Sequence, residues 1–133
     1  MNPNYAQVAL RALHRCEYCR APEAVFNFPF EVEHIIPLSQ DGIDDQTNWA
    51  LACRSCNIHK SIRVTCPDPE TEISVGLFNP RQDEWHSHFQ IDGETGEIIG
   101  LTSSGRATVI CLRMNSRAQL IARHQWIQLG IFP

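Results

Sequence analysis

Two pairs of cysteines with the same spacing are the first residues in this sequence whose types and positions suggest chemistry. Cys16 and Cys19 form one C-x-x-C pair, and Cys53 and Cys56 form a second one 33 residues later. Each such turn can direct two thiolates at one ion, and two turns complete a closed tetrahedral site typical of structural zinc. The spacing therefore predicts a structural Zn2+ bound by four cysteines. The alternative is four buried thiols that pack as small apolar side chains.

The segment between the cysteine pairs carries a carboxylate and a histidine side by side, in the stretch EVEHIIPLSQDG. An insert of 33 residues is too long for a compact zinc ribbon, so we expect the cysteines to clamp the base of an inserted structure. Glu33 and His34 end an apolar, strand-like run, and Pro37 turns the chain into a polar loop. Since neighbouring residues of a strand point to opposite faces, Glu33 and His34 are expected to have separate roles.

These residues, with others after the second cysteine pair, match the requirements of phosphodiester hydrolysis. A histidine is the natural base for a water that must lose a proton near neutral pH, and a divalent cation stabilises the leaving oxygen and the charge at phosphorus. The candidate base is His34. The candidate ligands of the cation are Glu33 with Asn57 or His59, because oxygen and imidazole donors suit such ions. The residues leave open which of Asn57 and His59 completes the site.

The motifs CEYC, VEHIIPLSQDG and TNWALACRSCNIHKS together resemble the HNH endonuclease family closely, over residues 16–61 and just over a third of the chain. The resemblance implies a ββα-metal core of the His-Me finger type that hydrolyses DNA, with Mg2+, or Mn2+ in its place, as the catalytic cation. The later stretch from LFNPRQDEWHSHF to IIGLTSSGRATVICLRMN is similar to an extension of some bacterial HNH proteins, and it implies no function.

The resemblance also assigns roles by position. His34 becomes the general base, and Asn48 becomes the catalytic-site residue that steadies the loop and the orientation of His34. Glu33 and Asn57 become metal ligands, although the family more often has Asp at the first of these positions. His59 lies two residues beyond the position that matches, so its place as a ligand is the less direct one.

Charge is distributed unevenly along the chain, whose formal net charge is −4. Residues 1–97 contain 7 Lys and Arg against 15 Asp and Glu, whereas residues 98–133 contain four arginines and no acid. A basic segment of this kind either binds phosphate or forms a solvated helix face, and both interpretations stay open. The candidate contacts to a nucleic-acid backbone are Arg54, Lys60, Arg63, Arg106, Arg113 and Arg117.

The elements that must position these groups follow from the apolar pattern. For the first half we expect a helix over 4–14, an extended segment over 23–37, a returning strand over 48–53 and a helix from residue 54. A strand, a loop, a strand and a helix closed by zinc would bring Glu33 and Asn57 towards one point.

For the second half we expect a strand over 72–78, a hairpin over 88–102 and two helices over 102–130. Thr102 or a following serine is the expected cap of the first helix, and Asn115 is the expected cap of the second, with Arg117 and Arg123 away from the apolar side. His86 and His88 would share one face of a strand, where we favour structural or surface roles for them.

Together these patterns predict an α+β protein with a zinc-stapled ββα-metal core over 1–66. An α+β extension over 67–133, made of a β-hairpin and two helices, is expected to pack on it within one compact unit. Cys66 and Cys111 are expected to be separate buried thiols. There is no run of about 18 apolar residues and no secretory pattern, so we expect no membrane span and a cytoplasmic protein.

The sequence therefore predicts a metal-dependent endonuclease whose partner is DNA rather than RNA. The rival interpretation is a non-catalytic zinc module that binds nucleic acid or protein, and the acidic net charge favours it slightly. A third is a toxin-like nuclease that a partner keeps inactive.

Overall fold

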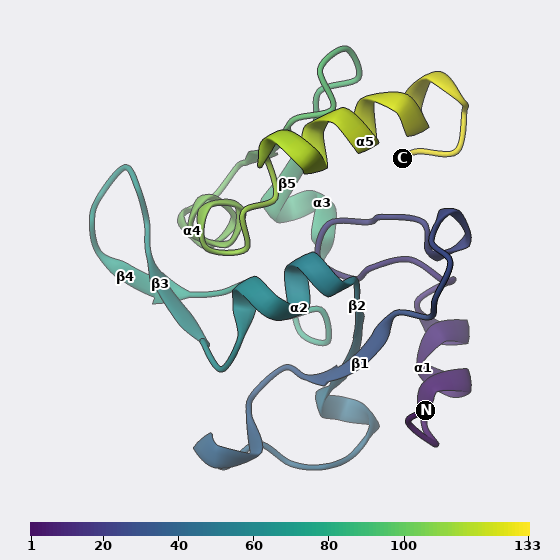
Figure 1. The fold of residues 1–133 in the computed structure, drawn as a ribbon. Coiled ribbons are helices and arrows are strands. Elements are labelled where there is room, and N and C mark those ends of the chain that lie inside the picture. Colours follow the sequence, from purple (N-terminus) through teal and green to yellow (C-terminus); the bar gives the residue numbers. More distant parts are fainter.

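Two antiparallel strands and the helix after them form the centre of the first half of the molecule. The computed structural model describes all residues, 1–133 (Figure 1). Its first half contains α1 (Tyr5–Arg11), β1 (Glu31–His34), β2 (Trp49–Ala52) and α2 (Arg54–Lys60), with 3-10 turns at Glu23–Val25, Leu38–Gln40 and Gln46–Asn48. In the β1–β2 pair, Glu33 lies opposite Ala50 and His34 opposite Trp49. The order strand, loop, strand, helix is the expected one, while its assignment as a ββα-metal core stays a prediction.

The long extended segment expected before the polar loop is only partly a strand. Residues Glu23–Val25 form a 3-10 turn, and β1 starts at Glu31, after Pro29. The buried backbone N–H of Phe30 donates to the carboxylate of Glu23 over 2.6 Å instead of to a neighbouring strand. Because Pro29 has no N–H for a ladder, strand pairing begins only beyond it.

Helix α2 begins inside the second cysteine pair. Cys53 is its N-cap, and the sulfur of Cys53 accepts a hydrogen bond from the backbone N–H of Cys56 over 3.5 Å. The helix ends at Lys60 because Ser61 has a φ of 52°, outside the right-handed helical region. Two turns of helix thus connect the cysteines to a lysine.

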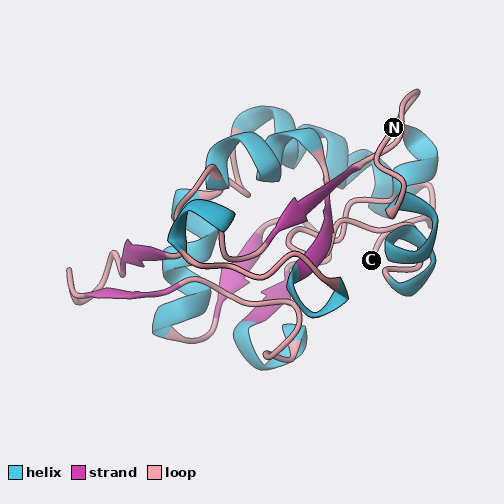
Figure 2. Cartoon of the chain, turned by 90° about the horizontal axis from the view of Figure 1, so that it is seen from below, coloured by secondary structure: helices cyan, strands magenta, loops and turns pink.

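The second half adds short strands and helices to the same interior. Its elements are β3 (Thr65–Pro67), β4 (Ser74–Gly76), α3 (Trp85–His88), β5 (Phe89–Ile91), β6 (Ile98–Gly100), α4 (Ser103–Cys111) and α5 (Arg117–Gln128). All three sheets are two-stranded and antiparallel: β1–β2, β3–β4 and β5–β6. Thr102 caps α4 as expected, since its hydroxyl accepts from the N–H of Gly105 over 3.0 Å. The β3–β4 ribbon projects from one side of the molecule (Figures 1 and 2).

Two local expectations for this half are wrong. His86 and His88 lie in helix α3 and not on one face of a strand. Ser116, and not Asn115, caps α5, because the Asn115 carboxamide bonds to both backbone groups of Ile98, over 2.9 and 2.8 Å.

One cluster of 27 buried apolar side chains includes residues of both halves. It extends from Val8 of α1, through all four residues of β2, to Trp126 of α5. Helix α5 turns a different side inward than expected: Arg123 is wholly buried, and Ile121 is 56% exposed. None of the helices is both long enough and apolar enough to cross a membrane.

Cys66 and Cys111 are joined by a disulfide, with 6.6 Å between their Cα atoms. The expectation of two separate thiols is therefore wrong. The bond links β3 to α4 across 45 residues of sequence, and no local motif predicts this pairing. Together with a hydrogen bond of 2.9 Å from the N–H of Phe78 to the hydroxyl of Thr108, it fixes α4 against the start of the second half.

A second tie between these elements is an ion pair. Arg106 of α4 donates to both carboxylate oxygens of buried Asp68, over 3.0 and 2.9 Å, and its Nε lies 3.1 Å from the carboxylate of Glu70. The Asp68 carboxylate also accepts from the backbone N–H of Glu70 over 3.1 Å. The guanidinium lowers the pKa of Asp68 to about 2, so folding favours the charged carboxylate.

The substitution Arg106→Gln should lower the thermal stability of the protein above about pH 4, where Asp68 is charged in both the folded and the unfolded chain. The difference from the parent should shrink as the pH falls towards about 2, through the folded pKa of Asp68. Circular dichroism melts between pH 7 and pH 2 measure it. Exposed Arg113→Gln is the matched control, and a difference that stays constant with pH would contradict the assignment.

Candidate metal centre and active site

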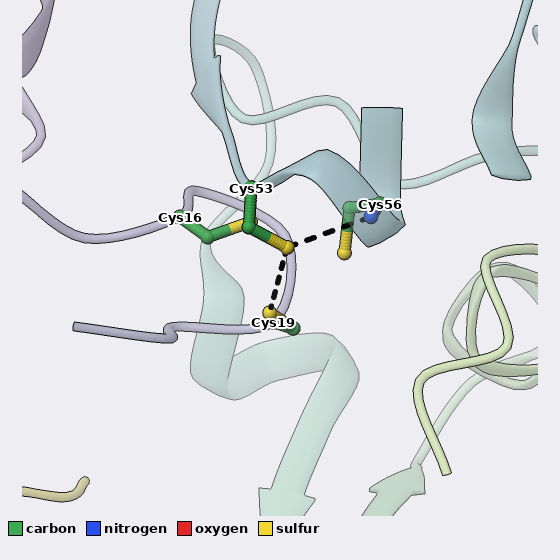
Figure 3. Close-up of side chains that lie close together, drawn as sticks. All are labelled: Cys16, Cys19, Cys53 and Cys56. Atoms are coloured by element: carbon green, nitrogen blue, oxygen red, sulfur yellow. Dashed lines mark hydrogen bonds between the residues drawn. The ribbon is translucent and has the colours of Figure 1, made fainter. Parts of the chain in front are cut away.

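The four cysteines of the two C-x-x-C pairs converge in the interior (Figure 3). All four are buried, and their sulfur atoms lie within 4.8 Å of one another. The sulfurs of Cys19 and Cys53 are 3.7 Å apart. Tetrahedral zinc with Zn–S bonds of about 2.3 Å sets its sulfurs about 3.8 Å apart, so this geometry fits a metal ion.

The electrostatics of the four thiols also fit a cation. Hydrogen bonds from neighbouring thiols, that of Cys16 first, hold the pKa of Cys19 well below its ordinary value. The same contacts, with burial, raise the pKa of Cys53 and of Cys56. The protein alone thus stabilises one thiolate at the expense of others, and a bound divalent ion would be needed for all four to ionise.

Both cysteine turns also reach the carboxylate of Glu33. Tyr18, between Cys16 and Cys19, donates its hydroxyl to Glu33, and Lys60 of α2 donates to the same carboxylate over 3.2 Å. All three side chains are buried. Burial raises the pKa of Glu33, and the nearby Lys60 ammonium opposes that rise. Glu33 is therefore held by the first cysteine turn and by the end of the helix that begins in the second one.

The other candidate ligands of a catalytic cation lie further along α2. The amide nitrogen of Asn57 donates to the carboxylate of Glu31 over 2.5 Å, and Nδ1 of His59 lies 3.3 Å from the hydroxyl of Ser55. Glu33 and Asn57 thus have different partners, although both belong to the β1–α2 contact. Their joint role as metal ligands stays a prediction, as does that of His59.

His34 has its own partner. Its Nε2 lies 2.8 Å from Oδ1 of Asp44, and the indole N–H of Trp49 donates to the same oxygen over 3.1 Å. These bonds, that of His34 first, lower the pKa of Asp44. The His34 side chain is 31% exposed, so solvent reaches the ring. Asp44 could not be predicted from the sequence, because an acidic loop residue carries no signal of which histidine it meets.

Asn48 ties together Ile36 and Ile43 in the segment between β1 and β2, and Asp44 directly follows the second of these residues. The buried carboxamide of Asn48 accepts from the N–H of Ile36 over 2.9 Å and donates to the carbonyls of Ile36 and Ile43, each over 2.8 Å. Gly42 makes the closure possible, since a Cβ there would lie 1.9 Å from the carbonyl oxygen of Ile36. This geometry is compatible with the steadying role expected for Asn48, which stays a prediction.

The candidate nucleic-acid contacts fall into two groups. Lys60 is 1% exposed and bound to Glu33, and Arg106 is bound to Asp68, so both cations already have partners. The arginines with exposed side chains are Arg54, Arg63, Arg113 and Arg117.

The cysteine cluster, the strand pair and helix α2 all lie within one stretch of sequence that matches a known family. The model of the HNH endonuclease family matches residues 16–63. This confirms the resemblance drawn from the residue pattern. No curated protein and no solved structure matches the chain. An HNH segment with a four-cysteine cluster suggests a nuclease or a related function on nucleic acids.

The purified protein should contain one zinc ion per chain, and Cys56→Ala should lose most of it because a tetrahedral site then lacks a ligand. Metal analysis of the gel-filtered protein measures the content. The double variant Cys66→Ala/Cys111→Ala, which removes the other two cysteines, should keep its zinc. Equal zinc in Cys56→Ala and the parent would rule out the proposed site.

Proposed function

We propose that the protein is a metal-dependent endonuclease that hydrolyses phosphodiester bonds of DNA. The observation that carries the proposal is the histidine of the HNH segment: His34 lies at the end of β1, open to solvent, with one ring nitrogen on a carboxylate. This is the arrangement that a general base for water needs.

His34 is the proposed general base, and Asp44 its orienting partner. When the Asp44 carboxylate accepts a hydrogen bond from the N–H of Nε2, the other ring nitrogen, Nδ1, carries the lone pair. Nδ1 has no hydrogen-bond partner within the protein, so it is free to take a proton from water. The ring becomes positive in that step, and the ionised carboxylate of Asp44 stabilises it. Asn48 keeps this geometry by holding the carbonyl of Ile43, the residue directly before Asp44.

Glu33 and Asn57 are the proposed protein ligands of the catalytic divalent cation, Mg2+ or in its place Mn2+, with His59 as the alternative to Asn57. Once bound, the cation would supply charge stabilisation at the phosphorus and at the leaving oxygen. The buried bond to Lys60 holds Glu33 in one position but competes for its charge. Glu31, which already contacts Asn57, is the neighbouring carboxylate against which this assignment has to be tested.

DNA is the proposed partner, and exposed arginines are its proposed contacts. Arg54 and Arg63 lie at the two ends of the α2 region, Arg113 lies between α4 and α5, and Arg117 is the first residue of α5. Contacts of this kind bind phosphate and position a duplex, but they do not read its sequence.

His34→Ala should reduce cleavage of a supercoiled plasmid in Mg2+ or Mn2+ by at least about 100-fold, since a general base contributes that much. Asp44→Asn should reduce it by less, because the base remains and only its orientation and its stabilised charge are lost. Gel electrophoresis measures both, with zinc content as the check of folding. His86→Ala, an exposed histidine of α3, is the control. Undiminished cutting by His34→Ala would make the mechanism wrong.

Glu33→Gln should raise the Mg2+ concentration needed for half-maximal cleavage and lower the maximal rate, because an amide binds Mg2+ more weakly than a carboxylate does. Glu31→Gln should leave the Mg2+ requirement close to that of the parent. Metal titrations of plasmid cleavage measure both variants. The reverse result would move the ligand role to Glu31.

A second candidate function is binding without catalysis by a zinc module. Two observations favour it: the net charge of −4, and the ion pair that already occupies Glu33. A protein of this kind would retain DNA or a protein partner without divalent cations and would never cut a strand. The plasmid assay across metals separates the two functions.

A further inference from the structure

A cavity of about 420 Å³ lies between α2 and α5, which come from opposite halves of the chain. Its walls are formed by the end of the 3-10 turn at Glu23–Val25 and the phenylalanine after it, by α2, and by α5 with its cap. Val25 and Ala118 in its lining are exposed, so the cavity opens to solvent. Its volume is in the range of pockets that bind small ligands.

One side of this cavity is aromatic. Phe26 and Trp126 both line it, with 6.0 Å between their ring centres. Phe28, which is 48% exposed, lies edge-on to Phe26 at 6.3 Å. Aromatic rings stack well on flat ring systems, and every nucleobase has a flat face. The lining therefore suits a planar, ring-shaped ligand.

The cavity also contains polar groups that the fold leaves free to bind a ligand. Ser55 and His59 line it one helical turn apart on α2, and the hydroxyl of Ser55 lies 3.3 Å from Nδ1 of His59. Nε2 of His59 and the side-chain carboxamide of Gln119 have no hydrogen-bond partner in the protein. Base-binding pockets use such donors and acceptors to read the edge of a base that lies between aromatic or apolar side chains.

The charge next to the cavity is positive. No Asp or Glu is in its lining. Exposed Arg54 and Arg117 are sequence neighbours of lining residues of α2 and α5. Arg63 donates to the backbone carbonyl of His59 over 2.6 Å. Because such cations bind phosphate, a nucleotide, with its flat base and negative phosphate, matches the cavity better than a neutral aromatic ligand does.

We propose that this cavity binds one unpaired base of the DNA, so that DNA with a bulged or single-stranded position binds more tightly than a fully paired duplex. Taking a base out of a duplex costs pairing and stacking energy, and the cost is least for a base that is already unpaired. The proposal rests on DNA being the partner, as proposed above, and it does not depend on cleavage.

The place of the cavity on α2 relates it to the candidate active site. Ser55 and His59 share one face of the helix. Asn57 lies between them on another side and donates to Glu31 of β1. A helix with its side chains is only about 10–12 Å wide, so one DNA strand that crosses α2 meets both places. In this arrangement His59 binds the base, and Asn57 is left as the ligand of the cation.

The experiment measures binding of the full-length protein to three labelled DNA duplexes by fluorescence anisotropy, without added divalent cation so that no strand is cut. The duplexes differ at one position: fully paired, with one bulged adenine, or with one bulged abasic residue. The bulged adenine should bind about 10-fold more tightly than the abasic bulge, within the range for stacking of one base. It should also bind more tightly than the paired duplex. Because the two bulges share a flexible backbone, the difference between them measures the base alone.

The outcomes separate this proposal from the proposed function. Equal affinity for the two bulged duplexes, or for the bulged adenine and the paired duplex, would overturn the base pocket and leave DNA binding intact. Failure to bind any of the three would remove DNA as the partner, and the base pocket with it. Absence of plasmid cleavage with the preference intact would contradict the proposed catalysis alone.

Two variants on α5 locate the binding site. Gln119→Leu removes the free carboxamide from the cavity, and Ala118→Leu fills the cavity from an exposed position. Each should remove most of the preference for the bulged adenine over the abasic bulge. Gln125→Leu, the same substitution at an exposed position of α5 outside the lining, should keep the preference. Full preference in either cavity variant would overturn the proposal.

Photochemical crosslinking of the unmodified chain gives a readout that does not depend on any variant folding. A duplex with 5-iodouracil as the bulged base is irradiated in the complex, and the crosslinked peptide is identified by mass spectrometry. The crosslink should fall on a peptide that contains Phe26, His59 or Trp126, since these rings line the cavity. A crosslink confined to other peptides would also overturn the proposal.

Discussion

Four buried sulfur atoms within one small site are the constraint on which the rest of this structure depends. Thiols packed this closely cannot all ionise unless a cation joins them, so the geometry of Cys16, Cys19, Cys53 and Cys56 is one that a metal would complete. Each half of the cluster also extends towards Glu33, through Tyr18 on one side and Lys60 on the other. The same cluster therefore brings two distant turns of the chain together, and residues next to it set the position of a carboxylate near the end of β1.

The β1 strand separates two environments with different chemistry. On one face, Glu33 is buried and bound by a phenol and an ammonium, in a setting where charge is costly and every polar atom needs a partner. On the other, His34 is partly exposed and meets Asp44 on a surface loop. Two adjacent residues thus experience unlike surroundings, because the side chains of a strand alternate.

Patterns within short stretches of sequence predicted much of this. The C-x-x-C spacing located the cysteine cluster, and the Thr102 cap and the hairpin pattern located elements of the second half. Long-range partners could not be predicted. Arg123 resembles a solvated helix residue until the carbonyl of Gly96 is found against its guanidinium, and Lys60 resembles a phosphate contact until Glu33 is found beside it. In both cases the deciding partner lies far away in the sequence and carries no local signal.

The closure of the polar loop by Asn48 has a consequence for its evolution and engineering. Because the Asn48 carboxamide ties Ile36 to Ile43, the exposed residues 38–41 form a loop whose two ends are fixed. Extra residues inserted there would lengthen the loop without displacing Ile36 and Ile43 at its ends. The loop is thus a natural graft point, where a new recognition segment can be tethered beside His34 while the strand that carries it stays in register.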